Sequence, residues 1–335
     1  MVEKVANSFE EADGPAPFPE VAASCERELR LKGFACRVRL VRGGVAVTPM
    51  DSAPADLSPL ASLPVKELDL SETQGVDLRA LAGFKLTGLS LAGLAAADLS
   101  PLAGGSLTWV DLSRSPVSDL APLLGHPLEK VNLRRSQVAD LSPLSRAPLE
   151  DLDLGLAPLS SLRALAGNET LKRLDLFKTE VEELAALRDT PLEELDLSGT
   201  EVTGLRPLRG LPLRILTLRA TAVADLSPLQ GMPLETLRLS GSKVTDLTPV
   251  SHCPIRDLTL TGLALEDLSP LASMPLERLT VSCDTLPPRQ LEFLASLDQL
   301  EFLGEAADPP DQTPEAFLKR AASLPQTETQ TLSRA

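Results

Sequence analysis

The chain carries eleven copies of one spaced apolar pattern, L-x-x-L-x-L, which begin at Val65 and run to about Leu286. Nine of the eleven steps between successive copies, counting a terminal copy at Leu300, are 21 residues long. When each copy is numbered from zero, positions 0, 3 and 5 are aliphatic throughout, and positions 13 and 16 are nearly as regular. A fixed period of this length is typical of stacked coils that bury their apolar side chains against neighbouring coils. The copies begin at Val65, Leu86, Leu107, Leu128, Leu149, Leu171, Leu192, Leu213, Leu234, Ile255 and Leu276.

This spacing predicts an α/β leucine-rich-repeat solenoid, with a parallel β-sheet on the concave face and short 3₁₀ or turn segments on the convex face. In each strand, positions 3 and 5 point inward, and positions 2, 4, 6 and 7 form an outward surface that we call the sheet face. Position 8 is Ser or Thr in seven copies, where a hydroxyl can satisfy backbone groups at the turn. Position 12 is Asp in seven of ten places, usually shortly before a Pro, which indicates the cap of a short 3₁₀ turn.

Four segments are expected along the chain. Residues 1–17 are acidic and proline-rich, so we expect them to be disordered. Residues 18–55 combine helical apolar spacing with two strands that turn at a Gly-Gly pair, which predicts an N-terminal cap made of a helix and a β-hairpin. Residues 56–303 form the repeat array with a C-terminal cap, and residues 304–335 form a polar tail with one short helix over Pro314–Ser323.

Composition restricts the classes of partner. The formal net charge is −15 and the pI is about 4.7, which disfavours nucleic acid and anionic membranes because both are held by surplus Lys and Arg. The chain has no run of 18 apolar residues, and its first residues lack the apolar core of a secretory signal. Four cysteines are too few for a disulfide framework in a chain of 335 residues. We therefore expect a cytoplasmic protein with free thiols and a protein partner of unknown identity.

The residue pattern does not favour catalysis. A serine nucleophile needs a His and an acid nearby, and the chain has only His126 and His252. The repeated Asp at position 12 lacks the oxygen-rich loop that calcium requires. We expect no catalytic residue, no metal site and no cofactor.

The wording D-L-S-P-L-x-x-x-P-L-x-x-L-x-L, best seen over Asp225–Val250, resembles bacterial leucine-rich repeats found beside serine/threonine kinase domains in planctomycetes and verrucomicrobia. It is more distantly similar to internalin repeats and to the phosphatase-regulator type. The resemblance covers about residues 20–303 and implies the solenoid fold. No kinase activity is implied, because the chain lacks the Gly-rich loop, H-R-D and D-F-G motifs.

Five residues differ from the small and acidic background that we expect on the sheet face. We predict that they form a partner-binding patch, because exposed Trp, Phe and Arg are frequent interface anchors. Trp109 and Phe177 should lie about 15 Å apart across three strand steps, with a notch at Gly155. The five residues are Trp109, Arg134, Arg135, Phe177 and Lys178.

Two structural alternatives stay open. In the first, Trp109 packs flat on its neighbours while Phe177 shields the irregular repeat at Leu149–Thr170. A run of Asp at position 4 is interpreted as a solvated face, with docking of a basic peptide as the alternative.

The function that we expect is a non-enzymatic protein-protein interaction module. One alternative is a recognition subunit of a signalling or effector system whose catalytic part lies on another chain. The other is a secreted or surface structural or adhesion protein.

Overall fold

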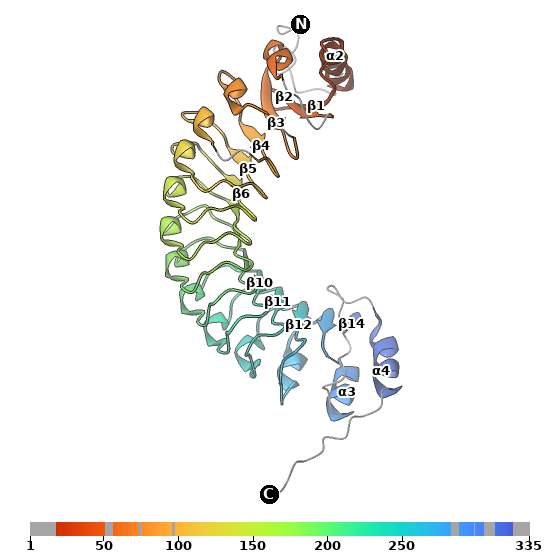
Figure 1. Cartoon of the computed structure of the whole chain (residues 1–335). Helices are drawn as coiled ribbons and strands as arrows, with labels where there is room; N and C mark the ends of the chain where they lie inside the picture. The colour runs from red at the N-terminus through yellow and green to blue at the C-terminus, as the bar shows by residue number, and fades with distance from the viewer. Residues whose placement is uncertain are drawn as a thin grey trace, which may run out of the picture. The chain divides into compact units, whose positions relative to one another are not determined.

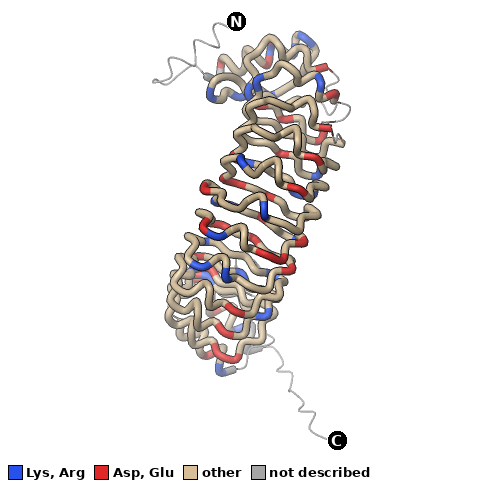
Figure 2. The backbone as a smooth tube through the Cα atoms, turned by 90° about the vertical axis from the view of Figure 1, so that its left-hand side faces the viewer, with Lys and Arg blue, Asp and Glu red and all other residues tan. Residues whose placement is uncertain are grey.

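The computed structural model describes residues 18–50, 56–73, 76–95, 98–282, 288–297, 299–304 and 312–323 (Figure 1). The expected disordered segment 1–17, Cys283 and most of the expected tail lie outside these residues. The repeats wind into successive coils, which are visible as adjoining loops of the backbone tube in Figure 2. The predicted short helix over Pro314–Ser323 is present.

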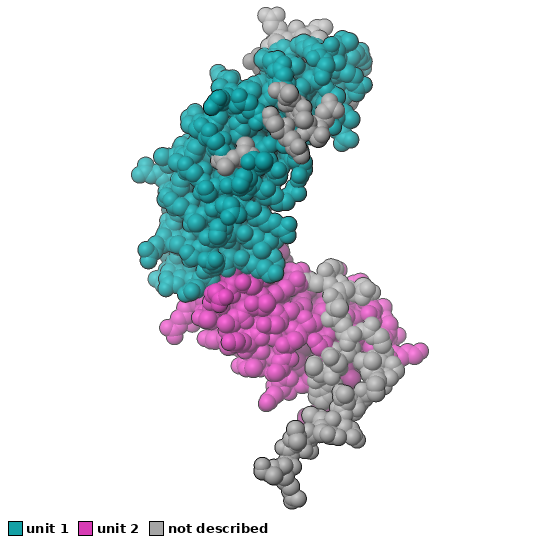
Figure 3. Space-filling view, in the orientation of Figure 1, with its two compact units in different colours: residues 1–192 teal, residues 193–335 magenta. Residues whose placement is uncertain are grey.

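The chain forms two compact units, residues 1–192 and 193–335 (Figure 3). In the first unit, β1 pairs with β2 in antiparallel fashion, and β2 to β8 are parallel neighbours in chain order. In the second unit, β9 to β14 are parallel neighbours in chain order. The first unit contains α2 (Phe18–Leu31), β1 (Cys36–Val41), β2 (Gly44–Pro49), β3 (Val65–Asp69), β4 (Gly88–Ser90), β5 (Trp109–Asp111), β6 (Lys130–Asn132), β7 (Asp151–Asp153) and β8 (Arg173–Asp175). The second unit contains β9 (Glu194–Asp196), β10 (Ile215–Thr217), β11 (Thr236–Arg238), β12 (Asp257–Thr259), β13 (Arg278–Thr280), α3 (Pro288–Ala295), β14 (Phe302–Gly304) and α4 (Pro314–Ser323).

The core has the predicted register. Leu192, Leu195 and Leu197, at positions 0, 3 and 5 of one copy, are all at most 2% exposed. Strand pairing repeats the 21-residue step, so that Trp109 pairs with Lys130 and residues at equal repeat positions lie side by side. Short 3₁₀ turns carry each coil from one strand toward the next.

The strands are shorter than the sequence predicted. Most repeat strands cover positions 2 to 4, and position 7 already lies in the turn that follows the strand. Arg135 and Lys178 occupy this position with φ of 58° and 53°, in the left-handed region that favours glycine. Glycines occupy the same position in other copies, including Gly93 and Gly199. Position 7 therefore lies at the edge of the sheet face, in a turn.

The repeated polar residues hold the turns, as predicted. At position 8, the hydroxyls of Thr73, Ser115 and Thr200 donate to the carbonyl oxygen three residues earlier, at distances of 2.5 to 2.7 Å. At position 12, Asp98 and Asp140 each accept at 2.8 Å from the backbone N–H two residues later, which belongs to the first residue of the following 3₁₀ turn. The N-cap residue is the Leu in between, one residue after the Asp that the sequence predicted. Hydrogen bonds from Ser100 and Ser142 lower the pKa of the exposed carboxyl groups of Asp98 and Asp140 below the ordinary range. In each pair the serine hydroxyl has the largest effect and the serine backbone N–H the next largest.

The N-terminal cap is the predicted helix and hairpin. Cys25 and Leu29 of α2 are buried, and Cys36 and Val38 are the buried side chains of β1. The Glu26 carboxylate accepts a 2.8 Å hydrogen bond from the backbone N–H of Val38. The antiparallel β1–β2 hairpin precedes the parallel strands, so that β2 covers the first edge of the repeat sheet in this unit.

Candidate functional site

Trp109 lies flat across the neighbouring strand. It is half-buried at position 2 of β5, and its register partner on β4 is Gly88. A Cβ atom added to Gly88 would stand 2.0 Å from the indole Nε1 and 2.1 Å from Cε2, so only glycine leaves room for the ring. The next register partner on β3 is Glu67. Trp109 thus packs against its neighbouring strand, as the alternative interpretation expected. Its ring also lines an open cavity.

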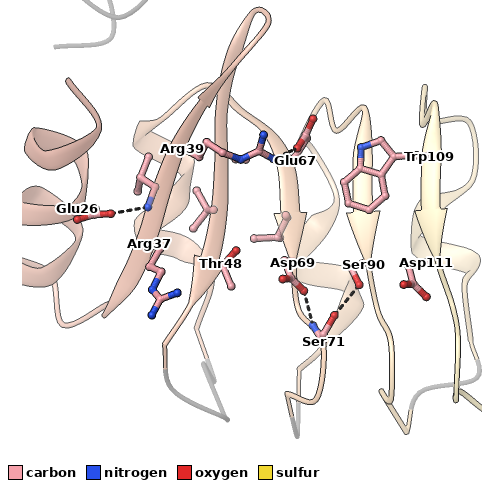
Figure 4. Close-up of a pocket in the computed structure, with 14 residues that line it drawn as sticks. Glu26, Arg37, Arg39, Thr48, Glu67, Asp69, Ser71, Ser90, Trp109 and Asp111 are labelled. Carbon is pink, nitrogen blue, oxygen red and sulfur yellow. Dashed lines mark hydrogen bonds and ion pairs between the residues drawn. The ribbon is translucent and has the colours of Figure 1, made fainter. Parts of the chain in front are cut away.

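That cavity has a volume of about 700 Å³ and lies between the N-terminal hairpin and β5. Figure 4 shows Arg39 directed toward Glu67 beside Trp109, and Asp69, Ser90 and Asp111 along the next row. The nearest Arg39 nitrogen and Glu67 oxygen are 3.0 Å apart. The charged side chains and the aromatic ring that line the cavity are Glu26, Arg37, Arg39, Glu67, Asp69, Asp111 and Trp109.

Arg134 fills the notch that the sequence predicted at Gly155. A Cβ atom on Gly155 would stand 2.4 Å from Arg134 Nη1, so the guanidinium lies directly over this glycine. The same Nη1 atom lies 2.9 Å from Asp175 Oδ2 and 3.3 Å from Asp153 Oδ1. The expectation of an open notch was therefore wrong, because the long side chain of the preceding repeat reaches across it.

Phe177 lies between two cations. The guanidinium carbon of Arg134 and the ammonium nitrogen of Lys178 are each 5.2 Å from the centre of the Phe177 ring, within the range of a cation–π interaction. Arg135 is exposed in the position-7 turn, where its backbone N–H donates to Gly155 O at 2.8 Å. The structure thus gathers Arg134, Phe177 and Lys178 into one cluster.

The five predicted residues consequently do not form one patch: Arg134, Phe177 and Lys178 form a cluster, and Trp109 and Arg135 each lie outside it. Among the described residues, no hydrogen bond, ion pair or cation–π contact joins the side chain of Trp109 or Arg135 to the cluster of Arg134, Phe177 and Lys178. Trp109 belongs to the cavity beside the N-terminal cap. Whether these residues bind a partner stays a prediction.

Comparisons with known proteins concern the fold. No family profile and no curated protein matches the sequence. An internalin (inlF) from Listeria monocytogenes is similar, with 22% identity and a TM-score of 0.63 over 77% of this chain and 78% of that one. The leucine-rich repeat domain of APL1B has 14% identity and a TM-score of 0.53 over 90% and 95% of the two chains. A chain of the mouse RP105/MD-1 complex has 20% identity and a TM-score of 0.54 over 81% and 55%. The chain is a leucine-rich-repeat solenoid.

Within this leucine-rich-repeat solenoid, the Asp run at position 4 has a structural role that the sequence did not reveal. Asp69, Asp111 and Asp153 each accept from the backbone N–H two residues later, at 2.8 to 3.0 Å, and so close the turn that ends the strand. Asn132 interrupts the charge of the run but makes the same 3.0 Å bond. The signal available in the sequence was the single Asn within the Asp run, because Asn shares this hydrogen-bonding geometry with Asp.

Burial and neighbouring charges shift the pKa values of Arg134 and Asp153. The pKa of Asp153 is raised, mainly by burial and also by the neighbouring Asp175 charge, against the opposing Gly155 N–H and Arg134. Desolvation is the largest influence on Arg134 and lowers its pKa, but Asp153 and Asp175 together raise that pKa above its ordinary value. Through its ion pairs with Asp153 and Asp175, Arg134 links three consecutive repeats on the sheet face.

His126 and the cysteines that the structure describes are buried. His126 is buried, with Nδ1 accepting from Leu107 N–H at 3.2 Å and Nε2 donating to Leu102 O at 2.9 Å. Burial lowers its pKa, against the opposing hydrogen bonds of the backbone. Cys25, Cys36 and Cys253 are free and buried. The described residues hold no cluster of His, Cys, Asp or Glu suited to a metal ion, and none of their helices has the length and apolar character for a membrane crossing.

Proposed function

We propose that the protein is a non-enzymatic protein-protein interaction module that binds its partner through the sheet face of the first unit. The observation that carries this proposal is the support given to its two sheet-face aromatic side chains. Gly88 admits the Trp109 ring, and Arg134 and Lys178 lie against Phe177. Side chains that are already ordered lose little further entropy on binding, which favours their use as anchors.

The fold supports the same proposal. Leucine-rich-repeat domains are typically protein-binding modules, and one of the similar folds was solved as the RP105/MD-1 complex. The finer relationship, to the bacterial repeats that accompany kinase domains, is also a proposal and rests on the D-L-S-P-L wording.

Photo-crosslinking distinguishes the two sides of a coil. A benzophenone amino acid would replace either Lys130, exposed at position 2 between the two aromatic groups, or Leu124, which is 63% exposed after the 3₁₀ turn Ala121–Leu123. The two positions are six residues apart in the sequence, so they lie in the same part of the chain. A difference in crosslinking therefore reports which side of the coil, sheet or turn, faces the partner. We expect one defined protein to crosslink in cells at Lys130 and not at Leu124. Crosslinking of the same protein at Leu124 alone would place the interface on the turn side and contradict the proposal.

A further inference from the structure

We propose that the cavity beside the N-terminal cap receives a positively charged side chain, Arg or Lys, of the partner protein. This inference rests on the proposed function, because it names the chemistry of one contact on the same sheet face. It differs from that function in using a particular cavity, of about 700 Å³, and its own test needs no partner.

Two rows of side chains define the cavity. In the upper row of Figure 4, Arg39 pairs with Glu67, and the Trp109 ring occupies the space above Gly88. In the lower row, Asp69, Ser90 and Asp111 occupy position 4 of three consecutive parallel strands. Because parallel strands are about 4.8 Å apart, the two carboxylates flank a space about 10 Å wide.

No described cation forms an ion pair with Asp69 or Asp111 in the lower row. Asp69 accepts from the backbone N–H of Ser71 at 3.0 Å. Asp111 accepts from the backbone N–H of Ser113 at 2.8 Å and from the Asn132 amide at 3.3 Å. All three donors are neutral, so none of them offsets the charge of a carboxylate. Both side chains are half-buried, where a Coulomb interaction is stronger than in bulk water.

Glu67 differs from these two residues, because Arg39 already neutralises it. Trp109 adds the aromatic surface that attracts a cation most strongly. An aromatic ring beside two carboxylates that form no ion pair with a described cation is complementary to a guanidinium or ammonium group. Arg37 and Arg39 are both exposed on the opposite wall, and only Arg39 forms an ion pair with a described residue. An acidic occupant held by Arg37 is therefore the rival that the experiment must exclude.

Intrinsic fluorescence reports on this site alone, because Trp109 is the single tryptophan and the chain contains no tyrosine. The full-length protein would be titrated with acetyl-Gly-Arg-Gly-amide, with the citrulline peptide as a neutral match of the same shape, and with the glutamate peptide. We expect a saturable change in Trp109 emission with the arginine peptide. Loss of its charge should weaken binding about tenfold for citrulline, which corresponds to one cation–π contact and one ion pair.

The carboxylates are tested with Asp69→Asn combined with Asp111→Asn. Asparagine preserves the turn, as Asn132 shows in the natural sequence, and removes only the charge. The matched control is Asp196→Asn in the second unit, where the same turn closes on Ser198 N–H at 2.7 Å. We expect the double variant to bind the arginine peptide about tenfold more weakly and the control to bind it as the wild type does.

Three results would overturn the inference: equal binding of the arginine and citrulline peptides, wild-type affinity in the double variant, or preferred binding of the glutamate peptide. A failed titration together with sheet-face crosslinking at Lys130 would reject the cationic contact and leave the interaction module intact. A successful titration without that crosslinking would reject the module and retain the cavity's preference for cations.

Discussion

Trp109 occupies the space that the missing side chain of Gly88 leaves on the adjacent strand, and a Cβ atom there would stand 2.0 Å from the indole nitrogen. The same relationship joins Arg134 to Gly155, where the corresponding distance is 2.4 Å. In both pairs a glycine on the neighbouring repeat determines where a large side chain can lie. Large sheet-face side chains are thus positioned by the repeat beside them.

Gly88→Ala should displace the Trp109 ring. Because the new methyl group meets the rigid ring, we expect a shift in the Trp109 emission maximum and a loss of about 1–3 kcal/mol in the free energy of unfolding. Fluorescence spectra and urea titration measure both effects. Gly204→Ala is the matched control, since a Cβ atom there has nothing within 4 Å. An unchanged Gly88→Ala spectrum would mean that the ring does not rest on this glycine.

Leu195→Ala and Glu194→Ala test the strand register at adjacent positions. Leu195 is 2% exposed at position 3, so its truncation should lower the free energy of unfolding by about 2–5 kcal/mol. Glu194 is only partly buried at position 2, and its truncation should cost about 0.5 kcal/mol or less. Equal losses in urea titration would place the register one residue away from the one described.

His126 should make stability depend on pH. Burial lowers its pKa below the ordinary value of about 6.5, so the unfolded chain binds the proton more readily between the lowered pKa and 6.5. The stability that neutral His126 contributes is complete above that window and is lost as the pH falls through it. The difference in unfolding free energy between wild type and His126→Gln should therefore shrink from pH 7.5 to pH 5, by an amount set by the pKa shift.

The control for this experiment is His252→Gln, because His252 is exposed in another turn. Its stability should run parallel to the wild type across the same pH range. A difference between wild type and His126→Gln that stays constant with pH would show that His126 is not held in its neutral form.

The described thiols should resist modification in the folded protein. Burial, with smaller contributions from Glu26 and Cys25, raises the pKa of Cys36 to about 11, and burial also raises the pKa of Cys25 and Cys253. Because the thiolate is the reactive form, an aromatic disulfide reagent at pH 8 should modify them more than about tenfold faster in urea than in buffer. Cys283→Ser removes the fourth thiol, which lies outside the described residues. Equal rates in the two conditions would contradict the packing around these cysteines.

The repeat fold could be predicted from the sequence because its signal is redundant. Leu195 and Leu197 have equivalents in every copy, so the period alone identifies positions 3 and 5 as core. The turns at position 7 were harder to predict, because residues as different as Arg135 and Gly199 share the left-handed conformation there. At both positions the backbone N–H donates to a carbonyl oxygen of the next repeat at 2.8 Å, which favours that conformation. The residue type at position 7 therefore does not predict the turn.

The candidate site was only partly predictable for a related reason. Trp109 and Phe177 stand out by residue type, but the sequence did not show that Arg134 would reach across Gly155 to Asp175. It also did not show that Trp109 would lie against Gly88 and open onto a cavity with the N-terminal cap. The direction of a large side chain depends on whether the residue beside it on the neighbouring repeat is a glycine. The repeat pattern, which compares equal positions, does not show this pairing of different residues.

The most direct test of the account is capture of the partner by the double variant Trp109→Ala/Phe177→Ala. The protein that crosslinks at Lys130 would be co-purified with the wild type, the double variant and Leu124→Ala, which removes an exposed apolar side chain from the turn side. We predict that the double variant loses capture, since truncating an anchor costs about 2 kcal/mol or more of binding, while its circular dichroism and melting curve stay close to the wild type. Leu124→Ala should capture normally. Retained capture by the folded double variant would contradict the claim that this sheet face binds the partner.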